Sequence, residues 1–96
     1  MDLGQAIRTL RMKQGMTQGQ LAEKCDMSVS GLSYLETGRS VPPKGTMEKL
    51  CNALGVPMSY MLLASIDETD IPEEKRVLYR ALVEPLRNEL LEKKED

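Results

Sequence analysis

The chain has 96 residues, which suffices for one small domain and excludes a second catalytic domain. It contains no histidine, and Cys25 and Cys51 are its only cysteines, so it lacks a ligand set for zinc and a Cys–His pair for nucleophilic catalysis. The net charge of −2 is uneven, because residues 1–63 carry +2 and residues 64–96 carry −4. The composition therefore argues against an enzyme and predicts neither a metal nor a cofactor.

The first two predicted helices follow one another closely. In residues 3–14 the apolar side chains recur at the three-and-four spacing of an amphipathic helix, and Gly15 ends the segment. Thr17 then opens a second helix, and Gln20 three residues later completes a capping box that satisfies its first backbone amides. The apolar side chains of the first helix are Leu3, Ala6, Ile7 and Leu10.

A third helix is predicted immediately afterwards. Ser28 is a suitable N-cap, and the pattern runs to Glu36 with two leucines facing inward. Only Cys25–Met27 joins the second helix to the third. Because so short a connector prevents an antiparallel arrangement, these two helices must cross steeply, as in a helix-turn-helix.

A proline loop separates the third helix from a fourth. Gly38 ends the third helix, and Pro42 and Pro43 prevent its continuation. Gly55 ends the fourth helix, and a last short helical turn is expected at residues 58–63. The apolar stripe of the fourth helix consists of Met47, Leu50, Cys51 and Leu54.

The remaining residues predict an acidic linker and one more helix. Residues 65–70 form the linker, and Asp70 with Glu73 is a plausible helix start. Pro85 should either kink the terminal helix or restart it as a first-turn residue. Val77 and Ala81 widen the apolar side of this helix beyond half its circumference. That apolar side contains Ile71, Leu78, Leu82, Leu86 and Leu90.

Two further features bear on the environment of the protein. Cys25 and Cys51 each fall in an apolar helical pattern, so we expect two buried thiols rather than a disulfide. The longest uncharged apolar stretch, Tyr60–Ala64, is too short to cross a membrane. We therefore expect a soluble, cytoplasmic protein with no membrane partner.

The motifs along residues 17–56 resemble one family. Residues 17–22 read Thr-Gln-Gly-Gln-Leu-Ala, residues 28–39 read Ser-Val-Ser-Gly-Leu-Ser-Tyr-Leu-Glu-Thr-Gly-Arg, and residues 53–56 read Ala-Leu-Gly-Val. This pattern is similar to that of the Cro/C1-type (Xre-like) helix-turn-helix transcriptional regulators. The resemblance implies an all-α fold, a five-helix lambda-repressor-like DNA-binding domain over residues 1–64, with an additional C-terminal helix in residues 65–96.

The third helix then becomes the candidate recognition helix, because its side chains off the leucine stripe are small and polar enough to enter the major groove. By resemblance, Val29, Ser30 and Tyr34 occupy the base-reading positions, and Ser33 shares their face. Val29 can meet a thymine methyl group, whereas the hydroxyls can bond to base edges. The expected phosphate contacts are Gln18, Ser28, Thr37, Arg39 and Lys44.

The motif also makes predictions about an ion pair, a turn and a glycine in the recognition helix. The resemblance implies that Arg11 and Glu36 pair across the first and third helices as a structural ion pair. Asp26 stands where this family often has a glycine, which puts the geometry of the loop in question. Gly31 weakens the recognition helix, and either close backbone approach to DNA or chance accounts for it.

The sequence predicts a regulator, a repressor, that binds double-stranded DNA as a homodimer with half-sites about one helical turn apart. The terminal helix can form the dimer interface, dock on its own domain, or leave dimerisation to residues 58–63. The alternative function is a protein-interaction module, or an antitoxin-like protein, that binds a partner through the terminal helix. The operator sequence and any effector stay open.

Overall fold

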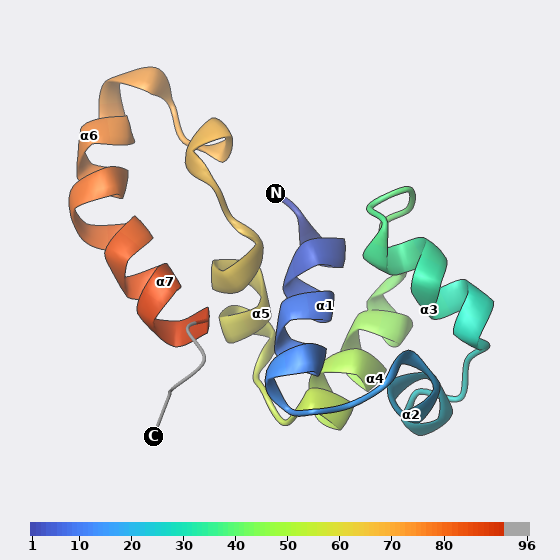
Figure 1. Ribbon diagram of the computed structural model, residues 1–96. Coiled ribbons are helices and arrows are strands. Elements are labelled where there is room, and N and C mark those ends of the chain that lie inside the picture. The colour runs from blue at the N-terminus through green and yellow to red at the C-terminus, as the bar shows by residue number, and fades with distance from the viewer. Residues whose placement is uncertain (92–96) are drawn as a thin grey trace.

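Short helices joined by tight turns make up the whole described part of the chain, residues 1–91 of a computed structural model (Figure 1). No strand occurs among these residues, which confirms the predicted all-α class. The first five helices are α1 (Leu3–Lys13), α2 (Gln18–Lys24), α3 (Val29–Glu36), α4 (Lys44–Leu54) and α5 (Met58–Ser65).

Local capping fixes the beginnings and ends of these helices. The Thr17 hydroxyl accepts from the Gln20 amide and the Gln20 side chain accepts from the Thr17 amide, so the predicted capping box at α2 is confirmed. Ser28 caps α3 by accepting from the backbone N–H of Gly31 at 3.0 Å. Gly55, at φ +70°, follows α4 in the left-handed region that glycine enters without strain.

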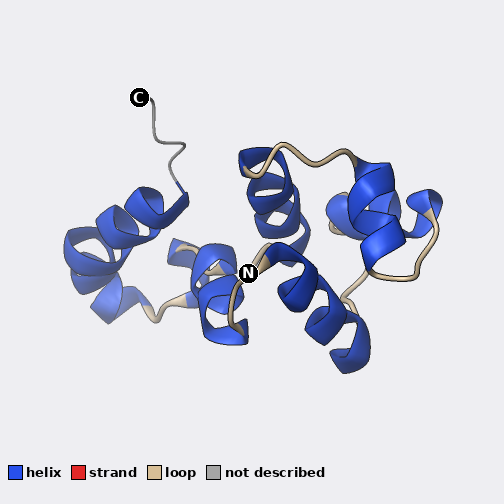
Figure 2. Ribbon diagram, turned by 90° about the horizontal axis from the view of Figure 1, so that it is seen from below, coloured by secondary structure: helices blue, strands red, loops and turns tan. Residues whose placement is uncertain are grey.

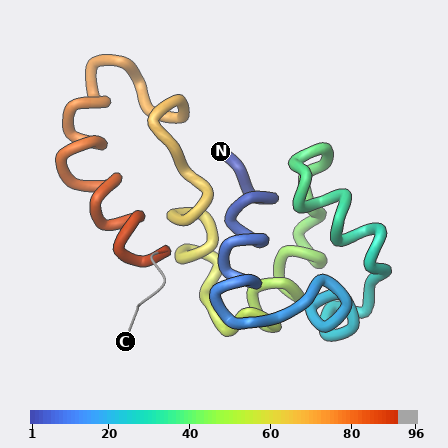
Figure 3. Tube along the Cα trace, in the orientation of Figure 1, coloured from blue at the N-terminus to red at the C-terminus, as the bar shows by residue number. Residues whose placement is uncertain are grey.

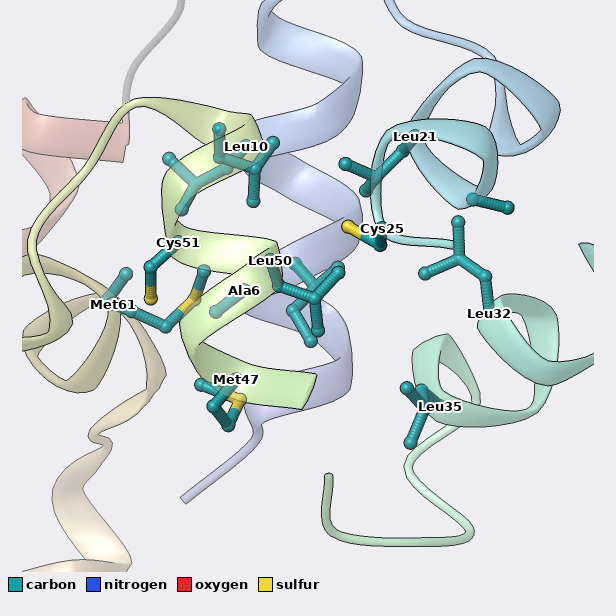
Figure 4. Close-up of a cluster of buried hydrophobic side chains, with 14 residues drawn as sticks. Ala6, Leu10, Leu21, Cys25, Leu32, Leu35, Met47, Leu50, Cys51 and Met61 are labelled. Atoms are coloured by element: carbon teal, nitrogen blue, oxygen red, sulfur yellow. The ribbon is translucent and has the colours of Figure 1, made fainter. Parts of the chain in front are cut away.

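The core lies between α1 and the four helices that surround it. Figure 4 shows aliphatic and sulfur side chains from all five helices meeting there, with Cys25 and Cys51 among them. Both cysteines are free and buried, and burial raises the pKa of each thiol above its ordinary value. Close packing of aliphatic side chains, without any phenylalanine or tryptophan, therefore holds the helices together.

Gly4 sets the distance between α1 and the end of α3. A Cβ atom built on Gly4 would lie 2.3 Å from the carbonyl oxygen of Leu35 and 3.0 Å from that of Glu36. Both neighbours are backbone atoms, which cannot rotate away as a flexible side chain can. The absence of a side chain at Gly4 therefore allows the first turn of α1 to rest directly on the end of α3.

The terminal helix folds back beside α5, as the chain trace shows (Figure 3). It consists of α6 (Arg76–Leu78), a π-helical turn (Tyr79–Val83) and α7 (Glu84–Leu91). The carbonyl of Leu90 accepts from Lys13 Nζ at 2.8 Å and from the Tyr60 hydroxyl at 2.6 Å. The ring of Tyr79 is almost fully buried, and its hydroxyl donates to the carbonyl of Ile66. This helix therefore docks on its own domain through one side.

Several expectations for residues 64–91 need correction. Ser65 belongs to α5, so the linker begins one residue later than predicted. Asp70 does not begin the terminal helix, because its carboxylate accepts from the Met1 amino group and the Asp67 amide, and Pro72 precedes the first turn instead. Pro85 is the second residue of α7, and the helical backbone runs without a break from Arg76 through the π-helical turn into α7. Pro85 thus stands in a first turn, as its second alternative predicted, but the helix does not stop before it.

The predicted apolar side of the terminal helix is divided by the fold. Ile71 and Leu90 are half-buried, whereas Leu78, Leu82 and Leu86 are exposed. The docked side instead contains Tyr79 and partly buried neighbours. In residues 1–91 no helix has the length and apolar character needed to cross a membrane.

Candidate nucleic-acid interface

The face of α3 that points away from the core carries the predicted reading residues. Leu32 and Leu35 are buried, which turns the opposite side of α3 toward solvent. Val29 and Tyr34 are half exposed, Ser30 is exposed, and Ser33 is partly buried. The four predicted base-reading side chains thus lie on one accessible helix face.

These four side chains line a shallow open groove of about 450 Å³. Three of the predicted phosphate contacts, Gln18, Thr37 and Arg39, complete its lining. Ser28 and Lys44 are exposed but are not part of this groove, because they lie at the starts of α3 and α4. The structure therefore brings together seven of the nine predicted contact residues.

Beneath this surface, Arg11 and Glu36 form a bidentate ion pair across α1 and α3. Arg11 Nε donates to Glu36 Oε2 at 2.8 Å, and its terminal nitrogen Nη2 donates to Oε1 at 3.0 Å. A second terminal nitrogen donates to the carbonyl of Met16 at 2.8 Å. Both residues are buried, and the charges are matched by hydrogen bonds, which such a pair requires. The pair fixes α3 against α1.

Gln18 extends this network toward the surface. Its Nε2 donates to Glu36 Oε1 at 3.1 Å, so one of its two N–H donors is already used. The amide keeps its second N–H and its carbonyl oxygen for a ligand. Glu36 therefore orients Gln18 as well as Arg11, and the amide at the start of α2 is held in place before anything binds.

The hydroxyls of Ser28 and Thr37, at the two ends of α3, differ in whether their hydrogen is available to donate to a ligand. Ser28 accepts a hydrogen bond as the N-cap, which leaves its hydroxyl hydrogen free to donate. Thr37 donates to the carbonyl of Tyr34 at 2.6 Å, so its hydrogen is engaged within the helix end. Thr37 is consequently a weaker phosphate donor than Ser28.

Two local questions left by the sequence are answered by backbone geometry. Asp26 has φ +54°, so it takes the left-handed conformation that a glycine would supply, and the turn between α2 and α3 is kept. A Cβ on Gly31 would lie 3.0 Å from the capping oxygen of Ser28. The lack of a side chain at Gly31 thus leaves room for the N-cap, a reason that the sequence alone did not reveal.

Sequence reasoning missed Arg8. This exposed residue lines a second cleft of about 290 Å³ beside the groove, together with Arg11, Gln18, Ser33, Glu36 and Thr37. Arg8 precedes Arg11 by three residues, so the two lie one helical turn apart on α1. That spacing was the available signal, since it places the exposed guanidinium of Arg8 next to the buried one of Arg11.

The crossing of α2 and α3 over a short turn, with an accessible outer face on the second helix, defines a helix-turn-helix. The family model for the helix-turn-helix domain matches residues 2–59, and the chain belongs to this family. The family predicted from the motifs in residues 17–56 is therefore confirmed.

Named relatives agree with this assignment. The immunity repressor protein of Bacillus phage phi105 is 39% identical over 75 residues, which cover 78% of this chain and 50% of that protein. The HTH-type transcriptional repressor RghR of Bacillus subtilis is 31% identical over 95 residues, covering 91% of this chain and 70% of RghR. The competence pilus inhibition repressor of Acinetobacter baylyi is 40% identical over 63 residues, covering 66% of this chain and 57% of that repressor. No solved structure gives a significant match.

The coverage differs among these proteins. The chain spans half the length of the phage repressor and 28% of the length of a Mycobacterium tuberculosis regulator with 38% identity over 71 residues. The family match covers residues 2–59, whereas the similarity to the phage repressor and to RghR covers 78% and 91% of this chain and so extends beyond that domain.

Proposed function

We propose that this chain is a sequence-specific DNA-binding regulator, a repressor, that inserts α3 into the major groove. The observation that carries this proposal is the groove on α3, where the four predicted base-reading side chains lie together with Gln18 and Arg39 at its rim. Three relatives with repressor names support the same function. The role is one of binding, with no catalytic step.

Each side chain of the reading face has a distinct chemical task. The methyl groups of Val29 can contact a thymine methyl, and the Ser30 hydroxyl can donate to or accept from a base edge. Tyr34 lines the same groove, from which its hydroxyl can reach a base or a phosphate. Ser33 is partly buried and lines the groove beside Ser30 and Tyr34, so its hydroxyl is the least accessible of the reading face.

Phosphate contacts surround this reading face. Arg39 supplies charge from the groove itself, and Lys44 supplies it from the start of α4. Arg8 adds a cation from the neighbouring cleft. Three such cations per protomer, or six per dimer, predict a slope of about −5 for log K against log salt concentration.

The protein acts as a homodimer in this proposal, because a single short helix reads too few base pairs for a specific site. Two α3 helices then enter successive major grooves about 34 Å apart, and the operator is palindromic. The exposed leucines of the terminal helix support a role in dimerisation.

The test is selection from a pool of random DNA duplexes at two salt concentrations. Wild type and a Ser30→Ala/Tyr34→Ala variant are compared, with Met12→Ala/Asn52→Ala as a control on exposed residues elsewhere. We expect wild type and control to enrich one palindrome that the reading-face variant loses. If wild type enriches no sequence, the regulator hypothesis is wrong for this chain.

The second candidate function is a protein-interaction module that uses the terminal helix. The observation in its favour is the same exposed apolar surface on α6 and α7. A chain that enriches no DNA sequence and stays monomeric would support this alternative.

A further inference from the structure

The exposed face of the recognition helix carries no amide and no cationic side chain. It consists of one aliphatic and three hydroxyl-bearing residues, Val29, Ser30, Ser33 and Tyr34. A bidentate contact with a purine needs more than a hydroxyl, because adenine pairs in this way with an amide and guanine with a guanidinium or ammonium. Among the residues that line the groove, such groups occur only on Gln18 and Arg39. Reading of a purine by two hydrogen bonds therefore requires a side chain from outside α3.

Gln18 lies beside the flank of α3, whereas Arg39 lies beyond the end of that helix. A Cβ atom on Gly19, the next residue of α2, would lie 4.0 Å from Cγ2 of Val29. The Gln18 amide bonds to Glu36, which follows Val29 by seven residues and so shares a side of α3 with it. Figure 1 and Figure 2 place α2 and α3 at the end of the molecule opposite α6 and α7. The terminal helix therefore lies away from this flank.

Glu36 fixes which end of the Gln18 amide donates. Gln18 Nε2 donates to Glu36 Oε1 at 3.1 Å, and the same carboxylate is held by two hydrogen bonds from Arg11. Because a carboxylate paired with an arginine only accepts, turning the amide over would place its carbonyl oxygen against Glu36. A glutamine without such a partner can exchange its N–H and C=O ends to suit different bases. The donor and the acceptor of Gln18 instead keep fixed places before DNA binds.

The groups that Gln18 retains match the major-groove edge of adenine. With one N–H bound to Glu36, the amide keeps one N–H donor and one acceptor oxygen. Adenine presents an acceptor at N7 next to a donor at its N6 amino group. Guanine presents two acceptors, thymine an acceptor and a methyl group, and cytosine a single donor. Adenine is therefore the base that uses both remaining groups of Gln18.

A phosphate matches the same amide less well. Phosphate oxygens only accept, so a phosphate can bond to the remaining N–H but leaves the carbonyl oxygen facing a negative charge. The neighbouring cleft contains Arg8, whose exposed guanidinium suits a phosphate better. The sequence alone favoured a phosphate contact for Gln18, because it did not reveal the bond to Glu36.

We propose that Gln18 is a specificity-determining residue that reads one adenine in each half-site. Its N–H donates to N7 of that adenine, and its carbonyl oxygen accepts from the N6 amino group. Glu36 and Arg11 are positioning residues that hold the amide in this orientation. The inference rests on the proposed DNA-binding function and specifies one base of the operator. It gives α2, in addition to the recognition helix, a part in reading the sequence.

The first experiment tests whether Gln18 selects a base. Selection from random duplexes is repeated with the full chain carrying Gln18→Ala, and circular dichroism checks that the variant is folded. Gln5→Ala is the matched control, because it removes an exposed glutamine outside the groove and the cleft. We expect Gln18→Ala to enrich the wild-type palindrome with one adenine position no longer fixed, and Gln5→Ala to enrich it unchanged. Replacing that adenine should lower wild-type affinity about tenfold per half-site and leave the affinity of Gln18→Ala unchanged.

The second experiment removes one acceptor atom from the DNA and leaves the protein intact. In 7-deazaadenine a C–H group replaces N7, while the Watson–Crick edge and the phosphates are unchanged. Placed at the selected position in both half-sites, this base should raise the wild-type Kd about tenfold, because one hydrogen bond is lost in each half-site. The Kd of Gln18→Ala should not change. The same replacement at other adenines of the site should affect both proteins alike.

The outcomes separate this inference from the proposed function. If Gln18→Ala weakens binding to all duplexes by the same factor and keeps the wild-type base preferences, Gln18 contacts a phosphate and the inference is wrong, while the regulator proposal stands. A selected palindrome in which every adenine tolerates the loss of N7 would overturn the inference in the same way. If wild type enriches no sequence, the regulator proposal and this inference both fail.

Discussion

Replacing Arg11 with methionine tests whether the buried ion pair positions the recognition helix. The substitution keeps an unbranched side chain of similar length but removes all three hydrogen bonds of the guanidinium, two to Glu36 and one to the carbonyl of Met16. The Glu36 side chain is only 3% exposed, so its carboxylate would be left buried with Gln18 as the remaining side-chain donor.

An uncompensated buried charge of this kind costs about 3 kcal/mol. A domain of this size has a total stability of about 5–10 kcal/mol, so the loss is a large part of it. With a urea m-value of about 1.5 kcal/mol/M, the midpoint of unfolding should fall by about 2 M. Arg8→Met is the matched control, since it removes an exposed arginine one turn earlier on α1 and should change stability by less than about 0.5 kcal/mol.

Two further measurements make the reasoning refutable. The double variant Arg11→Met/Glu36→Leu should recover most of the lost stability, because it leaves no unpaired charge buried. Its DNA affinity should nevertheless stay reduced, because the Gln18 side chain loses the carboxylate that orients it. Arg8→Met should weaken DNA binding while leaving stability intact. If Arg11→Met unfolds within about 0.5 kcal/mol of wild type, the pair does not hold α3 and this account of the interface is wrong.

Three other predictions follow from backbone contacts and titration. Gly4→Ala should destabilise the fold by about 2 kcal/mol or more in urea unfolding, because its Cβ would collide with the Leu35 carbonyl; an unchanged midpoint would contradict the close packing of α1 on α3. Asp26→Val should lower stability by about 1–2 kcal/mol, whereas Asp26→Gly should not, because only the former is strained at φ +54°. Hydrogen bonds from Thr69 to Asp67 and from Arg80 to Glu68 lower the pKa of these two carboxyls. The two ionised carboxylates therefore stabilise the fold at neutral pH, and this contribution is lost as the pH falls below about 4. Acid unfolding followed by circular dichroism should therefore be less steep in a Thr69→Ala/Arg80→Ala variant, and an identical acid transition would count against these bonds.

The parts of the fold that the sequence predicted depend on neighbouring residues. Thr17 with Gln20, Ser28 and Gly55 each act within one turn of their own helix, so spacing alone locates them. The exposed face of α3 was equally accessible to prediction, because burial of two leucines dictates which side chains point outward.

The parts that the sequence did not predict depend on distant contacts. Asp70 was expected to begin a helix, but its carboxylate binds the amino group of Met1, 69 residues away. Arg8 joins the interface only because α1 lies beside α3. The side of the terminal helix that docks is selected by Lys13 and Tyr60, neither of which belongs to that helix.

The π-helical turn has a consequence for how this chain tolerates changes in length. Such a turn amounts to one residue added to an α-helix, and the wider turn absorbs that residue, so the helix before and after it keeps nearly the same phase. Deleting a single residue between Tyr79 and Val83 would therefore allow a regular helix in which Leu78 and Leu86 are seven residues apart and within about 20° of one another around the axis, so the Leu90 carbonyl would stay near Lys13 and Tyr60. Docking of α7 and the exposure of Leu78 and Leu86 should therefore tolerate the loss of one residue in this segment, whereas one further residue inserted into regular helix would turn α7 by about 100°.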